Sequence, residues 1–585
     1  MRAFQSIVLA VIFGFAAATG VATETEDRLA PQLPPRGRAD LLLLHANARD
    51  PAFSQSSPEV AIAIRGGRIA AIVPVADAGA YRDSSTTVLD LGGATVVPGL
   101  VDAHAHLSNL GASLERVDLV GTRSAAEVAE RVAARARATP AGGWILGRGW
   151  DQNDWGGGGA FPSRSVLDAA APDHPVLLTR IDGHAVWANS RALALAGVDT
   201  STPDPEGGEI VRAPDGAPLG VLIDRAADLA EASVPPPSPM DIRRRLLAAM
   251  AVAHAAGLTG VHDAGIDAPV IEAYRALARE GRLTLRVYAM VSADAAGLDS
   301  ILAAGPLAEG LFTLRCVKIV ADGAMGSRGA LLLEDYADRP GHRGLVVTPK
   351  DRITTLTRQA LAAGFQVATH AIGDAAIRMT IDAYAEAMAA QENSGRQGDP
   401  RTDPGAGPRL RIEHLQRVEF HDFSRLAGLG IIASMQPTHA ISDMPWVGER
   451  LGTRRLRGAY AWRSVLNAGV VLALGSDFPV ESYRPLLGLY AAITRQDSAG
   501  QPPGGWLPEE QLSPREALSG ATRGAAFAAF AEHENGSLNP GFYADLTVLD
   551  LDPVFDPSAV DPRALLARDA VVATIVNGRL VYRRP

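Results

Sequence analysis

The sequence predicts an α/β protein built on a (β/α)₈ TIM barrel, with a small β-sandwich made from both termini and a domain inserted after the first barrel strand. Three observations predict this fold. Apolar runs of strand length recur along the 585 residues, helical patterns rich in alanine and leucine lie between several of them, and polar residues follow several of the runs. Right-handed crossovers between parallel strands close naturally into a barrel. An open doubly wound sheet is the competing fold, but only a ring brings all these strand ends to one centre.

The barrel is predicted over residues 97–535, and its elements follow in chain order. Eight apolar runs have the length and composition of buried strands. They lie at Val97–His106, Leu258–Asp263, Thr284–Val291, Leu314–Val320, Phe365–His370, Leu410–Leu415, Gly430–Gln436 and Val470–Asp477. Helical patterns between them occupy Asp241–Ala256, Ala268–Arg279, Thr355–Ala363 and Ala375–Ala390.

Both ends of the chain carry short strand patterns that are broken by turns. Before the barrel these patterns occupy Ala39–Leu44, Val60–Ile64, Arg68–Val73 and Thr87–Asp90. After the barrel they occupy Ala544–Asp550 and Ala570–Tyr582, where Asn577-Gly578 is a strong hairpin turn. We therefore predict one composite β-sandwich domain, made of residues 38–96 and 536–585. Two unrelated peripheral hairpins are the alternative.

Residues 107–240 separate the first two barrel strands and are far longer than a usual crossover. We predict an inserted cap or substrate domain here, ending at the stiff proline-rich stretch Val234–Pro239. Four of the seven tryptophans fall within it: Trp144, Trp150, Trp155 and Trp187. They would either wall an apolar substrate pocket or form the core of the inserted domain itself.

The N-terminus has the layout of a signal peptide. Arg2 is followed by the apolar run Ile7–Ala18 and by the small residues Gly20-Val21-Ala22. We expect residues 1–22 to be cleaved, which makes the protein exported, either periplasmic or secreted, with no stable membrane span afterwards. The net charge of -10 argues against a nucleic-acid partner. The oligomeric state is open, with a homodimer among the alternatives.

The first barrel strand ends in two histidines that share a face. Side chains alternate along a strand, so His104 and His106 point the same way, as does Asp102. Two neutral imidazoles on one face can bind a single divalent metal ion.

Further metal-compatible side chains stand on or at the ends of later predicted strands: Lys318, His370, His414 and Asp477. Each alone has an ordinary interpretation, such as a hydrogen-bonded core histidine, a helix N-cap or a lysine that reaches solvent. The C-terminal ends of barrel strands meet at one rim, and polar groups buried there are costly unless they are paired or coordinated. The joint pattern therefore predicts a metal site.

These residues belong to motifs through which the chain resembles the amidohydrolase superfamily, and within it the amidohydrolase-3 branch that includes N-substituted formamide deformylases. The likeness runs from about residue 40 to the C-terminus. The motifs are Pro98–His106, Asp182–His184, Trp187–Ser190, Thr202–Pro205, Gly207-Gly208, Lys318 with Asp322-Gly323, His370–Asp374, Ile412–His414, Gln436-Pro437 and Gly475–Asp477.

The resemblance implies one or two divalent metal ions, with zinc suited best and iron, manganese or cobalt also reasonable. By that resemblance the more buried ion takes His104, His106 and Asp477, and the second takes His370 and His414. Lys318 would bridge both as a carbamate formed with carbon dioxide. A one-metal site with an unmodified lysine stays open.

The resemblance also implies a reaction: hydrolysis of a carbon–nitrogen bond, other than a peptide bond, in a linear amide such as an N-substituted formamide. Its catalytic residues would be Asp477 as proton carrier, with His414 and His184. Asp102 is expected to support an imidazole. Arg148, Asp322 and His439 are further candidates for orienting the substrate. Hydrolysis of cyclic amides or esters, and a metal-binding barrel without catalysis, are the alternatives.

Overall fold

A computed structural model of the chain describes residues 37–52, 57–156, 160–181, 184–392, 407–554 and 560–585. The predicted signal peptide, 1–22, lies outside the described residues, and so does Asp182-Gly183 of one sequence motif. Among the helices of the described part, none combines the length and the apolar character that a membrane span requires.

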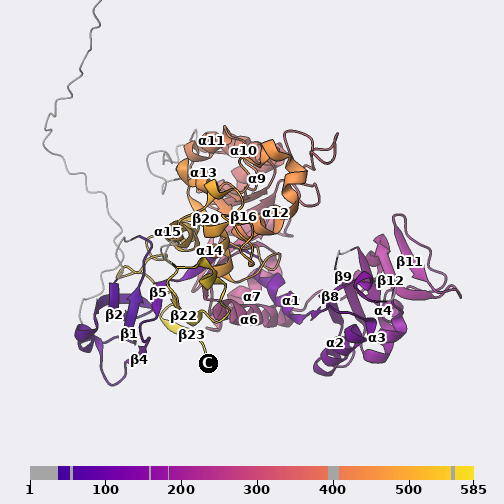
Figure 1. Cartoon of the computed structure of the whole chain (residues 1–585), viewed down its shortest axis with the longest axis horizontal. Coiled ribbons are helices and arrows are strands. Elements are labelled where there is room, and N and C mark those ends of the chain that lie inside the picture. Colours follow the sequence, from indigo (N-terminus) through magenta and orange to yellow (C-terminus); the bar gives the residue numbers. More distant parts are fainter. Residues whose placement is uncertain (1–36, 53–56, 157–159, 182–183, 393–406, 555–559) are drawn as a thin grey trace, which may run out of the picture.

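The centre of the molecule is a (β/α)₈ barrel, as the sequence predicts (Figure 1). Each neighbouring pair in the strand order β6-β13-β14-β16-β17-β18-β19-β20 is parallel. The eight strands are β6 (Leu100–Ala105), β13 (Leu258–Ile266), β14 (Arg286–Ser292), β16 (Phe312–Val320), β17 (Gln366–Ala371), β18 (Arg411–His414), β19 (Ile432–Met435) and β20 (Leu472–Leu474).

Backbone hydrogen bonds beyond the end of β20 close the ring. The amide of Asp477 donates to the His104 carbonyl at 2.7 Å, and the amide of His106 donates to the Phe478 carbonyl at 2.9 Å. Gly475 allows this close approach, because a Cβ there would lie 2.5 Å from the amide nitrogen of His104. The closure therefore places Asp477 directly beside the two histidines of β6.

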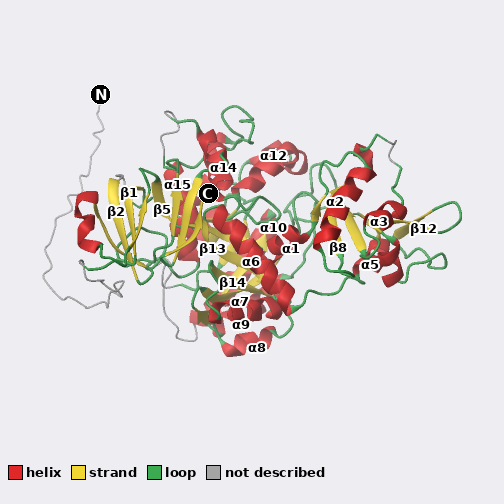
Figure 2. Ribbon diagram, turned by 90° about the horizontal axis from the view of Figure 1, so that it is seen from below, coloured by secondary structure: helices red, strands yellow, loops and turns green. Residues whose placement is uncertain are grey.

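Helices cover the outside of the barrel and bury the largest apolar core of the molecule against the strands (Figure 2). Helix α6 begins with a capping box, in which Ser238 and Asp241 bond each other's backbone amides. The main helices around the barrel are α1 (Leu107–Glu115), α6 (Pro239–Ala255), α7 (Ala268–Arg279), α8 (Leu298–Ala304), α9 (Lys350–Ala362), α10 (Asp374–Glu392), α11 (Asp422–Gly428), α12 (Pro437–Leu451), α13 (Trp462–Asn467) and α14 (Pro485–Thr494).

Strands from both ends of the chain share one eight-stranded sheet beside the barrel. The link is an antiparallel pairing of β5 with β21, in which Val96 lies opposite Val548, so the two ends are not unrelated hairpins. The pairings branch at β1, whose first half pairs with β4 and whose second half pairs with β5. The strands are β1 (Leu41–Ala48), β2 (Ser57–Arg65), β3 (Arg68–Pro74), β4 (Thr87–Asp90), β5 (Thr95–Pro98), β21 (Leu546–Leu549), β22 (Val571–Val576) and β23 (Arg579–Arg583).

Between α1 and α6 the chain builds a domain of its own, which projects to the right of the barrel in Figure 1. Its six-stranded sheet has the order β11-β12-β10-β9-β8-β7 and carries helices on both faces. The elements are β7 (Val117–Asp118), α2 (Ala125–Ala138), β8 (Ile145–Trp150), α3 (Arg164–Ala170), β9 (Val176–Arg180), β10 (Ala185–Ala188), α4 (Ser190–Leu195), β11 (Gly208–Arg212), β12 (Pro218–Asp224) and α5 (Arg225–Glu231).

Alternation along β10 explains the two apolar cores of the inserted domain. Trp187 enters the core beneath α2 and α3, whereas Val186 enters the core beneath α4 and α5. Trp150 and Trp187 are fully buried, and their rings meet at 5.8 Å with Trp155 packed on both. Of the two interpretations of these tryptophans, the structure supports the domain core over a substrate wall.

Candidate metal centre

Five of the predicted ligands converge at the C-terminal ends of the barrel strands. His106 Nε2 lies 3.0 Å from Asp477 Oδ1, and His104 Nε2 lies 3.7 Å from the same oxygen. The His414 ring stands 4.8 Å from the His104 ring and 4.5 Å from the His370 ring, measured between centroids. Residues from β6, β17, β18 and the end of β20 thus form one cluster.

In three of these imidazoles Nδ1 has a hydrogen-bond partner of its own, which leaves Nε2 for another partner. His104 Nδ1 bonds a Glu413 carboxylate oxygen at 2.5 Å, and His106 Nδ1 bonds the Ala264 carbonyl at 2.8 Å. His414 Nδ1 lies 2.9 Å from the Gln436 amide oxygen. Since these partners are acceptors, each Nδ1 carries the proton and each Nε2 presents a lone pair.

Several buried atoms of the cluster lack a hydrogen-bond partner among the described residues: His104 Nε2, His370 Nε2, His439 Nε2 and Asp477 Oδ1. Buried polar atoms without partners are costly, so their convergence on one space needs a compensating group. Imidazole nitrogens and carboxylate oxygens are ligands that zinc and related divalent cations accept. The donor set therefore fits a metal ion.

Burial keeps three imidazoles of the cluster, those of His104, His370 and His414, neutral. It lowers the pKa of His104 to about 4 and that of His370 to about 3, with the nearby Lys318 amine acting in the same direction. Burial likewise places the pKa of His414 well below its ordinary value. Burial opposes ionisation of Asp477, but the imidazoles of His106 and His104 beside it outweigh this effect and lower the pKa of the carboxyl to about 2. The cluster thus offers neutral imidazoles and an ionised carboxylate.

Lys318 points into the same region from β16 and is only 7% exposed. Burial lowers the pKa of its amine from the ordinary value. No hydrogen bond or ion pair ties Lys318 Nζ to another described side chain. The lowered pKa favours the uncharged amine, which is the form that reacts with carbon dioxide.

His439 adds a group to the opposite side of Asp477. It lies in the first turn of α12, where its Nε2 is 3.5 Å from Asp477 Oδ2 and its ring is parallel to that of His414. Its Nδ1 is 3.1 Å from the Gln416 amide nitrogen. His414, His439 and Asp477 therefore form a second grouping with metal-binding geometry, beside that of His104, His106 and Asp477.

His184, which was predicted to be catalytic, lies in the inserted domain and outside this cluster. His184 lies next to β10 in the inserted domain, where its Nδ1 bonds Asp224 at 2.9 Å and its side chain is 74% exposed. Arg148 is in the same domain, on β8. Residues between α1 and α6 complete a sheet of their own, and the strand that follows His184 belongs to that sheet.

Two carboxylates near the cluster accept hydrogen bonds from loops at the rim. Asp102 supports no imidazole: its oxygens accept from the Ser476 hydroxyl at 2.6 Å and from the Ser476 and His104 amides. Asp322 accepts the backbone amides of Leu331, Ile372 and Gly373, and its Oδ1 lies 3.5 Å from His370 Nε2. Both carboxylates fix loops at the rim.

The residue that does support an imidazole, Glu413, was missed by the sequence analysis. A usable signal exists: Arg411 and Glu413 alternate along a buried strand, so both point into the barrel, where charges must pair. Gln436, the partner of His414, was also missed as a support.

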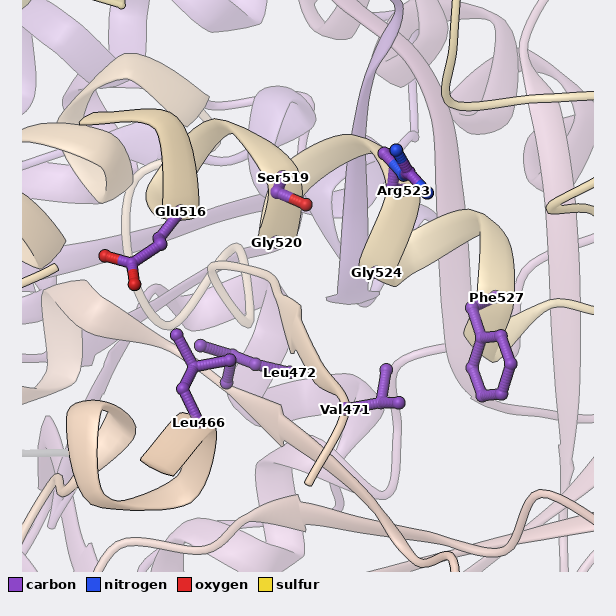
Figure 3. A pocket seen from close by; sticks show the side chains of 9 residues that line it. All are labelled: Leu466, Val471, Leu472, Glu516, Ser519, Gly520, Arg523, Gly524 and Phe527. Carbon is purple, nitrogen blue, oxygen red and sulfur yellow. The ribbon is translucent and has the colours of Figure 1, made fainter. Parts of the chain in front are cut away.

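A pocket elsewhere in the barrel is not part of the cluster. It lies at the N-terminal end of β20, where Val471 and Leu472 face Gly520, Arg523 and Phe527 (Figure 3). Asp477 and the histidines stand beyond the opposite ends of the strands.

The fold and the cluster together define a class: a metal-dependent hydrolase with its centre at the C-terminal rim of a (β/α)₈ barrel. A solved structure supports the class. An uncharacterized metal-dependent hydrolase from Pyrococcus furiosus matches with a TM-score of 0.73 and 28% identity, over 88% of this chain and 100% of that one.

Comparison with sequences narrows the class to one family. The amidohydrolase family model matches residues 87–582, so the chain belongs to the amidohydrolase family. It is 34% identical to the protein YtcJ of Bacillus subtilis, over 86% of this chain and 92% of that protein. It is 32% identical to N-substituted formamide deformylase of Arthrobacter pascens, over 93% and 98% of the two chains. It is 35% identical to Protein LONG AFTER FAR-RED 3 of Arabidopsis thaliana, over 89% and 88%. The protein is thus an enzyme that hydrolyses carbon–nitrogen bonds.

Proposed function

We propose that this amidohydrolase cleaves the carbon–nitrogen bond of a linear amide, such as an N-substituted formamide, releasing a carboxylic acid and an amine. The main observation behind the proposal is the ionised Asp477 carboxylate beside His104 and His439, whose Nε2 atoms are buried without hydrogen-bond partners. Support for the substrate class is the likeness to an N-substituted formamide deformylase along nearly the whole of both chains.

The ligand set that we propose has His104, His106 and Asp477 around one ion, and His370 and His414 around a second. Zinc is the proposed metal because histidine nitrogens and carboxylate oxygens suit it best. When bound, such an ion supplies Lewis acidity and lowers the pKa of a coordinated water to about 7. Lys318, as a carbamate, would add two anionic oxygens; as a neutral amine, it would leave a one-metal site.

The side chains of this protein supply the proton transfers. Because Asp477 is ionised at neutral pH, it can accept a proton from the attacking water and then give it to the departing amine. The balance is simple: the carbonyl carbon gains the hydroxyl group, the carbon–nitrogen bond breaks, and the nitrogen gains the proton. His439 Nε2 faces the same space and would hold the carbonyl oxygen.

A substrate panel tests the proposal. N-substituted formamides, ureas, lactams and aryl esters are assayed with the purified enzyme, with and without a chelator. Chelator-sensitive turnover of formamides above the other compounds is expected. Preference for lactams or esters would replace the linear amide, and an inert panel with ligand-dependent thermal stabilisation would favour a binding protein.

Two further parts of the proposal have separate tests. For Lys318, the protein equilibrated with carbon-13 bicarbonate should show a carbamate resonance that is lost in Lys318→Met; an identical spectrum for both proteins would exclude the carbamate.

For export, fractionation of the native host should place the activity outside the cytoplasm, with an N-terminus near residue 23. A full-length cytoplasmic form would contradict the proposed signal peptide.

A further inference from the structure

An ion pair is buried beneath the metal centre, inside the barrel. Arg411 and Glu413 lie on β18 and are both fully buried. The guanidinium binds both carboxylate oxygens, with Nε to Oε1 at 2.8 Å and Nη2 to Oε2 at 3.1 Å. Two hydrogen bonds from one guanidinium to both oxygens are the geometry of an ion pair, in which the carboxylate is the acceptor.

The rest of the guanidinium ties this pair to three other strands. Arg411 donates to the Ala103 carbonyl on β6 at 2.7 Å, to His262 Nδ1 on β13 at 2.8 Å and to the Ser434 hydroxyl on β19 at 3.0 Å. A planar group held by so many partners has one position. The carboxylate of Glu413 is therefore fixed as well.

The fixed carboxylate contacts one ligand of the centre directly. Glu413 Oε2 lies 2.5 Å from His104 Nδ1, and the opposite atom of that ring, Nε2, faces Asp477 without a hydrogen-bond partner. An ionised carboxylate accepts and never donates, so it selects the ring form with the proton on Nδ1. It also makes Nε2 more basic, as carboxylates behind metal-binding histidines generally do.

We propose that Arg411 and Glu413 act together as a positioning pair, which sets the tautomer and orientation of His104 and thereby the affinity of the centre for its metal. A purely structural role predicts something different. Buried ion pairs can often be replaced by apolar side chains of similar volume without loss of stability, so stability alone gives no reason to keep this pair. The inference rests on the metal centre of the proposed function, but on no choice of substrate.

The test uses the full chain and the double variant R411M/E413M, which leaves no buried charge unpaired. Zinc affinity is measured by competition with a chelator, and the thermal midpoint shows whether the variant is folded. We expect zinc to bind 10- to 100-fold more weakly. A matched control is E510Q, since Glu510 is a buried carboxylate that bonds Ser464 and not the centre. Its zinc affinity should equal that of the wild type.

If the folded double variant binds zinc as tightly as the wild type, the proposal is overturned. Should the double variant fail to fold, Glu413→Asp takes its place, because it keeps the charge for Arg411 but moves the oxygen away from His104. The same weakening of zinc binding is expected, and an unchanged zinc affinity again overturns the proposal.

Nitrogen-15 spectra of the metal-free proteins give a readout that does not depend on metal binding. His104 should be wholly protonated on Nδ1 in the wild type and mixed in the variant. A wild type that binds no zinc but shows this tautomer would refute the metal centre and retain the positioning.

Discussion

At the residue scale, chemistry at the rim depends on which atom of each side chain is left without a partner. Strand parity is enough to predict that His104 and His106 share a face, because alternation is a property of the backbone. It could not show which carboxylate stands behind His104, since that depends on contacts across the barrel. Asp102 has the right parity, but its oxygens accept hydrogen bonds from Ser476. The carboxylate that bonds the His104 imidazole is that of Glu413, which lies across the barrel on β18.

Replacing the proton carrier tests the roles assigned at this scale. Asp477→Asn keeps the shape of the side chain but removes the charge that accepts a proton. We expect kcat to fall by roughly 10²- to 10⁴-fold, the range of general acid–base catalysis, with weaker metal binding. Steady-state kinetics and metal analysis of the purified variant measure both effects. Asp550→Asn, at an exposed ion pair with Arg584, is the control. Full activity in Asp477→Asn would refute the role.

His439 allows substrate binding to be separated from metal binding. If it holds the carbonyl oxygen, His439→Ala should lower kcat by roughly 10²-fold, as loss of one such donor does, and leave the metal content unchanged. If His439 is instead a ligand, as its grouping with His414 and Asp477 also allows, the variant will lose metal. Metal content per chain therefore decides between the two roles.

At the element scale, the centre depends on how the ring closes. The eight strands could be predicted because each is a short apolar run between helical patterns. The closure of the ring could not be predicted, because β20 ends at Leu474 and the backbone hydrogen bonds to the β6 segment come from residues after it, which form no strand. His184 shows the same limit. Its motif is visible in the sequence, but only the pairing of β10 with β9 and β12 shows that it belongs to another sheet.

A methyl group at Gly475 should disturb this closure. In Gly475→Ala the new Cβ would lie 2.5 Å from the His104 amide and 2.6 Å from an Asp102 oxygen, so the two segments must separate. We expect a loss of about 1–3 kcal/mol in the free energy of unfolding, together with weaker metal binding. Urea denaturation and chelator competition measure these changes. Gly488→Ala, in α14 with no atom near its Cβ, should be neutral or stabilising. Equal behaviour of the two variants would contradict this account of the closure.

At the scale of the whole molecule, the chain combines a barrel, a sheet shared by both ends and an inserted domain with separate cores. An insertion could be predicted from the length of residues 107–240 alone. The position of the inserted domain could not be predicted, because no pattern in the sequence indicates which face of the insertion meets the barrel. The structure assigns α1 to the barrel, where it packs against α6, and the domain follows it.

The two apolar cores of the inserted domain are formed by its own residues, so this domain should fold without the barrel. We expect residues 116–233, expressed separately, to unfold cooperatively in urea and to show the blue-shifted fluorescence of buried tryptophans, since Trp150 and Trp187 have no exposed surface. Trp187→Ala should abolish or strongly weaken this transition, as loss of a buried aromatic costs about 3–5 kcal/mol. Red-shifted fluorescence without a transition would show that the domain needs the barrel.

The central claim is that side chains from β6, β17, β18 and the end of β20 hold a catalytic metal ion. Metal analysis of the purified protein, before and after dialysis against a chelator and again after reloading with zinc, tests it most directly when hydrolysis is followed alongside. We predict at least one divalent ion per chain, with activity lost on its removal and regained on reloading, and neither property in His104→Ala. A wild type that hydrolyses amides at full rate without any bound metal would contradict the account.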